Sequence, residues 1–259
     1  MENLLEFKNV NYFYQTKNDE IFALDNISFD VKEEEFVSLV GPSGCGKTTI
    51  LSLAAGLLKP SSGEVILDGE KKIDTTKIGY MFQRDMLFEW RTVWKNVTLG
   101  LELQKPKDID RKLAFAEELL KKYNLNSFKS RKPRSLSGGM RQRVALIRTL
   151  VMEPKLLLLD EPFSALDYQT RLTLCDDVAE ILKNEKKTAL LVTHDISEAI
   201  SLSNKIIVLS SRPAKVKDEI HLDLKGTTPL KKREDTSFGS YFDLIWRELT
   251  NEEEKNNSD

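Results

Sequence analysis

The stretch Gly41-Pro42-Ser43-Gly44-Cys45-Gly46-Lys47-Thr48-Thr49 decides how the rest of the chain is interpreted. It follows the apolar run 36–40, which is typical of a buried strand, and precedes the apolar, helix-forming residues 50–58. The spacing G-x-x-x-x-G-K-T between a strand and a helix is that of a loop whose backbone N–H groups surround a phosphate. We expect Lys47 to reach the outer phosphates of a nucleotide and the Thr48 hydroxyl to bind Mg²⁺ beside them.

Composition narrows the class of protein. At 259 residues the chain can bury one sizeable core and a smaller subdomain. Lys+Arg 39 against Asp+Glu 41 leaves a net charge of -2, so we predict no nucleic-acid partner. The two cysteines, Cys45 and Cys175, are too few for a disulfide framework and indicate a reducing compartment. Neither a membrane-spanning run nor a signal peptide is apparent, which predicts a chain that stays in the cytoplasm.

Short apolar runs that alternate with polar turns precede the glycine loop. They predict mostly antiparallel strands over residues 4–10 and 23–31, followed by the strand 36–40. Three aromatic residues lie just before a charged loop, and although aromatics there are more often core residues, one of them is a candidate to stack on a purine ring. These residues are Tyr12, Phe13 and Tyr14.

Two further strands are predicted after the loop, over residues 64–69 and 77–83. The second strand ends at Gln83, which by itself is only a polar residue at a solvated strand end. From about 84 to 150 the periodicity is helical, with helices expected over 93–103 and 111–123. We interpret this part as a helical subdomain inserted between strands of the core.

A serine and two glycines open the next predicted helix, which continues to about Met152. Ser137 is a plausible N-cap, and Gly138 and Gly139 would expose backbone N–H groups in the first turn. Taken alone, this pattern fits either an anion-binding helix start or merely a flexible one.

Polar residues follow two apolar runs typical of buried strands. Residues 156–159 lead directly into Asp160 and Glu161, and residues 188–193 lead into His194. Ligands of an open parallel α/β sheet bind at the carboxyl ends of its strands, so Asp160 is placed to hold Mg²⁺ and Glu161 to polarise a water molecule. A lone histidine is usually a packing or capping residue, but His194 ends a core strand as Asp160 does.

The remaining elements follow from caps and composition. A helix over 168–183 is expected with Asp167 as its cap, and residues 205–209 are expected to form the last core strand. Beyond residue 212 the chain becomes charged, with one amphipathic piece over 241–249 and a tail, 251–259, that we predict to be disordered.

The order of these motifs resembles the ATP-binding subunit of an ABC transporter over about residues 4–212. The resemblance implies an α/β fold, a P-loop NTPase (RecA-like) core with an N-terminal antiparallel β subdomain and an inserted α-helical subdomain. It implies a single ABC ATPase domain over 1–250, with the helical subdomain at about 84–150 and a C-terminal extension at about 213–250. The motifs are Walker A at Gly41 to Thr48, the Q-loop at Gln83, the signature at Leu136 to Met140, Walker B at Leu156 to Asp160, the D-loop at Ser164 to Asp167 and the H-loop at His194.

Roles for individual residues also come from this resemblance. It implies that Glu161, as the catalytic carboxylate, acts with His194, Lys47 and Gln83, and that Tyr14 stacks on adenine in preference to Tyr12 or Phe13. The residues implied to bind ATP are Tyr14, Gly41, Pro42, Ser43, Gly44, Cys45, Gly46, Lys47, Thr48, Thr49, Gln83, Ser137, Gly138, Gly139 and Asp160. Those implied to bind Mg²⁺ are Thr48, Gln83 and Asp160. Glu34 departs from the family's usual glycine, which bears on the turn geometry because glutamate adopts positive φ less readily.

The partners are implied in the same way. Because the signature belongs to the helical subdomain, it would serve the nucleotide of a second copy in a head-to-tail homodimer with two ATP molecules between the subunits. Separate transmembrane permease subunits would dock after Gln83, where Phe88, Trp90 and Trp94 are either contacts or core residues. An extracytoplasmic substrate-binding protein would act indirectly, and the chain would lie peripherally at the cytoplasmic face of the cell membrane.

Within the family, residues 82–97 and 209–216 are similar to importers of nitrate, alkanesulfonate, taurine and related small molecules. An ABC-type ATPase acting on DNA or the ribosome is the first alternative, but about ninety residues without sustained heptads separate the Walker A motif from the signature. A P-loop kinase or GTPase is the second, and it leaves the signature and His194 without a role.

Overall fold

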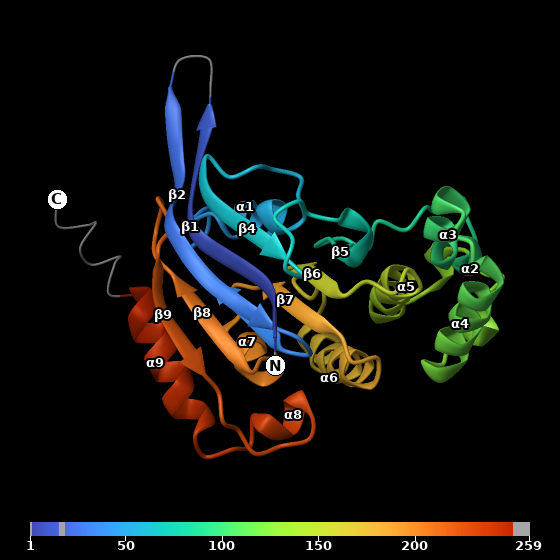
Figure 1. Cartoon of the computed structure of the whole chain (residues 1–259). Helices are drawn as coiled ribbons and strands as arrows, with labels where there is room; N and C mark the ends of the chain where they lie inside the picture. The colour runs from blue at the N-terminus through green and yellow to red at the C-terminus, as the bar shows by residue number, and fades with distance from the viewer. Residues whose placement is uncertain (1, 16–18, 251–259) are drawn as a thin grey trace.

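Two β-sheets and the helices around them make up the computed structural model, which describes residues 2–15 and 19–250 (Figure 1). The smaller sheet is antiparallel with the order β2-β1-β4, and the larger has six strands in the order β5-β6-β7-β3-β8-β9. Five strands of the larger sheet are parallel, and β9 is antiparallel to β8. The strands are β1 (Asn3–Gln15), β2 (Glu20–Lys32), β3 (Phe36–Val40), β4 (Ser62–Leu67), β5 (Ile78–Met81), β6 (Leu156–Asp160), β7 (Thr188–Val192), β8 (Lys205–Leu209) and β9 (Val216–His221).

The short helix over 229–232 was not predicted, whereas the other helices lie near their predicted positions, with differences at their ends. The predicted helix 93–103 is divided in two at Thr98, and the helix after the glycine loop begins at Lys47 because Gly46 serves as its N-cap. The caps predicted at Ser137 and Asp167 are confirmed, since their side chains accept hydrogen bonds from Met140 N and Thr170 N. The helices are α1 (Lys47–Ala54), α2 (Val93–Val97), α3 (Leu99–Gln104), α4 (Ile109–Lys122), α5 (Gly138–Leu150), α6 (Tyr168–Asn184), α7 (Ile196–Leu202), α8 (Pro229–Lys232) and α9 (Phe238–Thr250).

The larger sheet is buried on both faces. In β6, Leu156 and Leu158 face the smaller sheet and α1, whereas Leu157 and Leu159 face the helices on the other side. This is why β6 is a continuous apolar run rather than an alternating one. Near the β9 edge, α7 and α9 cover the sheet and bury Ile200 and Ile245.

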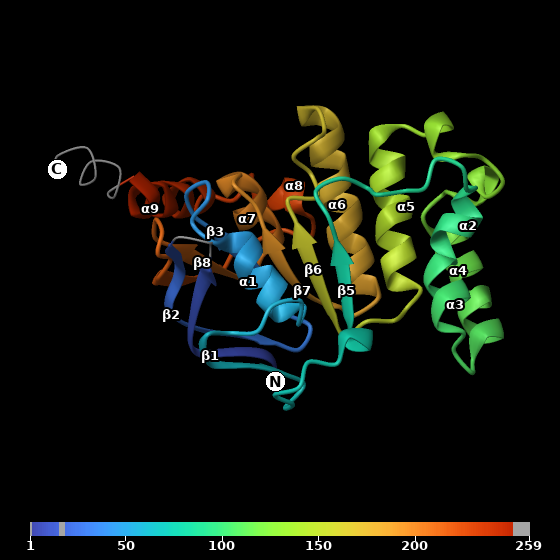
Figure 2. The same ribbon diagram turned by 90° about the horizontal axis from the view of Figure 1, so that it is seen from above.

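The helical part lies at the β5 edge of the larger sheet (Figure 2). Helices α2 to α5 are inserted between β5 and β6, as the sequence predicts. The apolar face expected for 111–123 is confirmed in α4, where Ala116, Leu119 and Leu120 are buried. Their burial joins the insert to the main core, so the insert and the sheet share one hydrophobic cluster.

The larger sheet has one strand more than the sequence predicts. Residues 205–209 are not the last strand of the sheet, because β9 pairs with β8 at the edge. The charged composition of β9 hid it, since only Ile220 of this edge strand is buried.

At the turn before β3, Glu34 adopts the left-handed conformation that glycine favours, with φ 59°, and its N–H donates to the Thr188 hydroxyl at 2.9 Å.

The C-terminal part beyond residue 212 contains more structure than its composition suggested. The amphipathic piece expected over 241–249 is confirmed as α9. The disorder predicted for 251–259 falls outside the described residues. Among the described residues, every helix is too short or too polar to cross a lipid bilayer.

Candidate functional site

The glycine loop joins β3 to α1 at the carboxyl edge of the parallel strands. Gly44 and Gly46 have φ of 73° and 126°, and a Cβ on Gly46 would lie 2.8 Å from Leu24 Cδ2. The Gly46 position therefore requires glycine, whereas Gly44 adopts the left-handed conformation that glycine favours. Lys47 is buried, and its ammonium donates to the carbonyl oxygens of Gly41 at 2.7 Å and Pro42 at 2.9 Å. The loop thus curves around its own lysine, which is the arrangement that presents backbone N–H groups and one positive charge to a phosphate.

The three aromatic residues near the end of β1 have different surroundings. Tyr14 is directed toward the glycine loop, because its hydroxyl lies 2.9 Å from Thr49 Oγ1 in α1. Phe13 stacks on Phe22 of β2, and the edge of Tyr12 meets the ring of Tyr14. Tyr14 and Phe13 expose similar fractions of their surfaces, 39% and 38%, so the contact with Thr49 is what distinguishes Tyr14. This supports the choice of Tyr14 among the three for a stacking role.

Asp160 is the last residue of β6 and lies half-buried. Its Oδ2 accepts a hydrogen bond from the Tyr80 hydroxyl at 3.2 Å, a contact that the sequence analysis missed. Burial raises the pKa of Asp160, and the bond from Tyr80 opposes that rise. Burial also raises the pKa of Tyr80 well above its ordinary value, so Tyr80 remains a donor throughout the physiological range.

Glu161 follows directly and departs from ordinary backbone geometry. Its φ is 46°, a left-handed conformation that is unfavourable for a residue with a Cβ, by about 1–2 kcal/mol. The turn is held by the Glu161 N–H, which donates to Val192 O of β7 at 2.9 Å. Such strain is characteristic of functional positions. The turn directs the carboxylate toward His194, whose Nδ1 lies 3.0 Å from Glu161 Oε2.

A network of hydrogen bonds fixes the turn that carries His194. The Thr193 hydroxyl donates to buried Glu198 at 2.6 Å and accepts from Asp195 N at 3.1 Å. Asp195 in turn caps α7 by accepting from Glu198 N. Because a carboxylate only accepts, the proton of the neutral His194 ring lies on Nδ1, leaving Nε2 as an acceptor.

Gln83 is joined to the same group of residues. Its Nε2 donates to Ser164 Oγ at 3.1 Å, and that hydroxyl donates to Glu161 O at 3.0 Å. The side chain of Gln83 is exposed, so it remains accessible to a bound molecule. The ends of β5, β6 and β7 therefore contribute one connected set of polar groups, as the parallel-sheet argument predicts.

The signature residues lie elsewhere. Ser137 caps α5, while a Cβ on Gly138 would lie 2.9 Å from Leu166 Cδ2 and one on Gly139 would lie 3.1 Å from Thr170 Cγ2. The start of α5 is therefore packed against the D-loop and α6 of its own chain. In the sheet, β7, β6 and β5 follow β3 in that order, so the strand before the insert is three spacings, about 14 Å, from the strand that leads into the glycine loop.

The donor set at the strand ends fits Mg²⁺ better than a metal held entirely by protein. Among the described residues, no three histidine, cysteine, aspartate or glutamate side chains cluster to form a metal site. Thr48 on α1 offers an exposed hydroxyl and Asp160 one carboxylate. One carboxylate, one hydroxyl and the oxygens of a bound phosphate are the ligands that Mg²⁺ takes in nucleotide sites.

The fold and this loop define an α/β P-loop NTPase with an inserted helical part. The ABC transporter family model matches residues 24–164. The chain is 43% identical to the uncharacterized ABC transporter ATP-binding protein YtlC of Bacillus subtilis (strain 168), over 98% of each chain. It is 41% identical to the aliphatic sulfonates import ATP-binding protein SsuB of Bacillus cereus (strain ZK / E33L), over 80% of this chain and 81% of that one.

A solved structure is similar as well. The dimeric structure of MJ0796, a bacterial ABC transporter cassette, has a TM-score of 0.72 and 35% identity, covering 85% of this chain and 99% of that one. The chain belongs to the ABC transporter family as an ATP-binding subunit that hydrolyses ATP. Membership in this family excludes the kinase and GTPase alternatives.

Proposed function

We propose that this ATPase energises the import of a small organic molecule, such as a sulfonate, through separate permease subunits at the membrane. The support for import is the similarity to SsuB, which is named as an import protein for aliphatic sulfonates. Nitrate, taurine and related compounds are further candidates from the sequence resemblance. Specificity for the transported molecule would reside in the permease and in an extracytoplasmic binding protein rather than in this chain.

At the nucleotide, the residues described above take distinct roles. The glycine loop and Lys47 hold the phosphates, Tyr14 stacks on the adenine, and Thr48 with Asp160 binds Mg²⁺ beside the outer phosphates. Mg²⁺ would neutralise the charge that develops on the transferred phosphoryl group. Gln83, just after the end of β5, would contact Mg²⁺ and the γ-phosphate.

Hydrolysis then requires a base and a group that positions the γ-phosphate. Glu161 is placed to accept a proton from the attacking water, and the phosphate oxygen of ADP is the leaving group. To bind the γ-phosphate, whose oxygens only accept, His194 uses its imidazolium form, in which Nδ1–H donates to Glu161 and Nε2–H donates to a phosphate oxygen. The 3.0 Å contact therefore couples the base to the residue that senses the phosphate.

The observation that carries the proposal is the separation of the signature from the glycine loop. The start of α5 packs on the D-loop and α6, since a Cβ on Gly138 would lie 2.9 Å from Leu166 Cδ2 and one on Gly139 3.1 Å from Thr170 Cγ2, rather than on the glycine loop of its own chain. A second copy arranged head to tail would supply Ser137, Gly138 and Gly139. The similar cassette MJ0796 is described as dimeric, which supports the same arrangement here.

Permease docking is proposed on the segment after Gln83. Four apolar side chains are exposed in or next to this segment, with Trp90 at 73% the most exposed and Phe82 lying just before Gln83. Trp94, in contrast, packs against the core and lies under Lys129, whose ammonium is 3.8 Å from the ring centroid, so it is a core residue. A cavity of about 370 Å³ opens beside the segment, between Asp85, Arg141 and Leu166. The exposed side chains are Phe82, Met86, Phe88 and Trp90.

A substitution at Glu161 tests the catalytic assignment. Glu161→Gln should retain ATP binding while hydrolysis falls by roughly 10²–10⁴-fold, the usual contribution of a positioned base. The same variant should accumulate as an ATP-bound dimer in size-exclusion chromatography with ATP and Mg²⁺. Glu118→Gln, at an exposed position on α4, is the matched control and should behave like the natural chain. Near-normal hydrolysis by Glu161→Gln would remove Glu161 from this role.

Two further measurements separate the parts of the proposal. Lys47→Ala should weaken ATP binding itself in a nucleotide titration, and unchanged affinity would contradict the phosphate role of the loop. Uptake of a radiolabelled alkanesulfonate, measured after the chain is combined with its permease subunits, tests import. ATP hydrolysis with no ATP-dependent uptake of any of the candidate anions would leave the ATPase intact and overturn the importer.

A further inference from the structure

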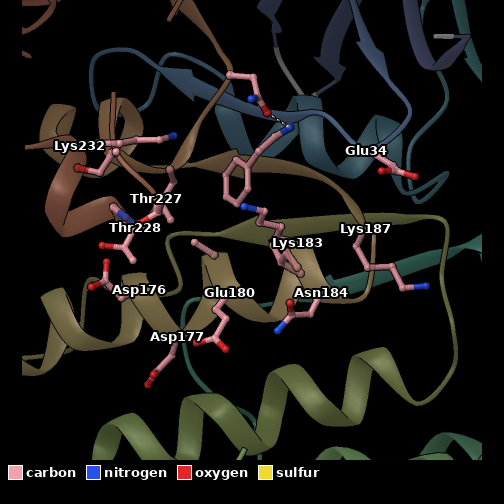
Figure 3. Close-up of a pocket in the computed structure, with 18 of the residues that line it drawn as sticks. Glu34, Asp176, Asp177, Glu180, Lys183, Asn184, Lys187, Thr227, Thr228 and Lys232 are labelled. Atoms are coloured by element: carbon pink, nitrogen blue, oxygen red, sulfur yellow. Dashed lines mark hydrogen bonds between the residues drawn. The ribbon is translucent and has the colours of Figure 1, made fainter. Parts of the chain in front are cut away.

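A second cavity lies away from the nucleotide site, between α6, the beginning of β3 and the segment 226–232 (Figure 3). Its volume is about 670 Å³, within the range of small-molecule sites. The cavity reaches Phe36, the first residue of β3, whereas the glycine loop follows Val40 at the other end of that strand. A five-residue strand spans roughly 16 Å, so this cavity and the nucleotide site lie at opposite ends of the sheet.

The segment that closes the cavity is fixed in place. Gly226 has φ 152°, and a Cβ there would lie 2.7 Å from Lys232 N, so only glycine allows this close approach. The Leu230 N–H donates to Asp176 Oδ1 of α6 at 2.9 Å, and Arg233 Nε donates to Ser201 Oγ of α7 at 3.0 Å. The C-terminal extension is therefore anchored to two helices of the ATPase, and these contacts fix the wall of the cavity.

Two lysines direct their side chains into the cavity from opposite walls (Figure 3). Lys232 comes from α8, and Lys183 comes from α6, where helical side chains tilt toward the N-terminus and so carry its ammonium back toward Lys232. Among the described residues, no carboxylate lies within ion-pair distance, 4.0 Å, of either ammonium. Burial lowers the pKa of Lys232, and the nearby charge of Lys183 lowers it further. The two positive charges thus repel one another without a compensating anion.

Two of the four carboxylates that line the cavity, those of Asp176 and Asp177, are engaged elsewhere, whereas Glu34 and Glu180 also line it. Asp176 accepts the bond from Leu230 N, and Asp177 forms an ion pair with Arg143 of α5 at 3.6 Å. In Figure 3, Asp177 and Glu180 point away from Lys232, toward α5. The nearby Lys187 is also engaged, since it donates to Pro154 O at 3.0 Å. Three lining lysines, Lys183, Lys186 and Lys232, remain to bind a molecule through charge, and of these Lys183 and Lys232 reach into the cavity from opposite walls.

We propose that this cavity binds a small organic phosphate, with Lys183 and Lys232 holding the phosphate group between them. A doubly charged head matches two unpaired ammonium groups, and charge-assisted hydrogen bonds of this kind are among the strongest in proteins. The organic part is inferred from the volume and from the apolar wall that Phe36, Leu182 and Leu202 contribute. The proposal does not depend on the transported molecule, because the site lies within the ATPase and away from the permease-docking segment.

Pyridoxal 5′-phosphate is a suitable probe, because it joins a phosphate to an aldehyde that condenses with a nearby lysine amine and releases water. After reduction with borohydride, mass spectrometry identifies the modified lysine. We expect Lys183 or Lys232 to be labelled at least ten-fold faster by pyridoxal 5′-phosphate than by pyridoxal, which lacks the phosphate. Exposed Lys225, outside the cavity, is the internal reference, because pyridoxal closes to a cyclic hemiacetal and labels any lysine more slowly; the ratios at Lys183 and Lys232 are therefore expressed relative to the ratio at Lys225. An equal ratio at all three lysines would overturn the proposal.

Variants make the test independent of simple lysine reactivity. Lys183→Met should reduce the labelling ratio at Lys232 toward one, whereas Lys225→Met should leave it unchanged. The ratio is the readout because loss of Lys183 also changes the pKa of Lys232, which affects both probes alike. A ratio that persists in Lys183→Met would contradict the role of the pair in phosphate binding.

Thermal unfolding with inorganic phosphate provides a measurement without covalent chemistry. The Lys47→Ala chain is used so that the glycine loop does not dominate phosphate binding. Phosphate should raise its Tm, since a ligand that binds only the folded state stabilises it. Adding Lys183→Met and Lys232→Met together should abolish the rise, and adding Lys225→Met should not. No rise in the Lys47→Ala chain, or the same rise after both cavity lysines are removed, would refute the site.

Discussion

Tyr80→Phe removes one oxygen atom, the donor to the carboxylate that we assign to Mg²⁺. Hydrogen bonds to charged acceptors contribute about 1.5–3 kcal/mol when buried. The 3.2 Å length exceeds the usual O–H···O distance, and Asp160 is only half-buried, so we take a smaller contribution, about 1 kcal/mol. That energy corresponds to about a five-fold change in an equilibrium constant. The Mg²⁺ concentration for half-maximal ATP hydrolysis should therefore rise about five-fold.

The pH dependence of ATP hydrolysis provides a second test of Tyr80→Phe, and the direction of the shift is predicted. Burial already raises the pKa of Asp160, and the Tyr80 bond opposes that rise by favouring the ionised form. Removing the bond raises the pKa of Asp160 further, so the variant should lose activity at a higher pH than the natural chain as the solution is acidified. ATPase rates measured over pH and Mg²⁺ concentration report both effects.

A matched control separates the metal site from general effects of losing a tyrosine hydroxyl. Tyr123 also donates to a carboxylate, Glu185 Oε1, at 3.1 Å, but in the helical part and far from the strand ends. Tyr123→Phe should leave both the Mg²⁺ requirement and the acidic limb unchanged. If Tyr80→Phe behaves the same way as this control, Tyr80 does not position Asp160 and the reasoning is wrong.

Other substitutions test the fold. Hydrogen bonds from Arg111 lower the pKa of Glu153 to about 2, so Glu153→Gln should lose about 0.5–1 kcal/mol of stability after allowance for solvent screening. In urea unfolding, the difference in unfolding free energy between the natural chain and Glu153→Gln should be full at pH 7 and vanish as the pH falls from about 4.5 toward 2. A difference that does not change with pH would exclude the ion pair as its cause. Gly79→Ala would place a Cβ 2.8 Å from Leu157 Cδ2 and against Thr149, and should destabilise by about 1–3 kcal/mol. Gly239→Ala in α9 meets no atom within 4 Å and should stabilise by up to about 1 kcal/mol, so equal effects on the two unfolding midpoints would refute the packing argument.

Features that depend on neighbouring residues were predictable from the sequence. The strand–loop–helix around Lys47 is local, and so are the caps at Ser137 and Asp167, each of which requires a side chain to reach a backbone N–H three residues away. The strand before Asp160 was predictable because burial on both faces leaves a continuous apolar run. These elements determine where the candidate nucleotide site is built.

Features that depend on which strands become neighbours were not predictable. Tyr80 meets Asp160 only because β5 pairs with β6 in a particular register, and nothing in the local sequence of either strand specifies that pairing. The edge strand β9 was missed because one buried residue in six gives no periodic signal. The Lys183–Lys232 pair is likewise a product of tertiary structure, since the two residues are separated by 49 positions and meet through the anchored extension.

The order of strands in the larger sheet has a kinetic consequence. If each nucleotide site needs Ser137, Gly138 and Gly139 of a second copy, a single copy cannot hydrolyse ATP. The turnover rate per molecule in dilute solution should then rise with the concentration of the protein. A permease that holds two copies side by side would replace this second-order encounter by a local concentration that, for short tethers, is on the order of millimolar. Under this scheme the permease activates ATP hydrolysis by keeping two copies together. Copies released from it would lose their ATPase activity without any inhibitor.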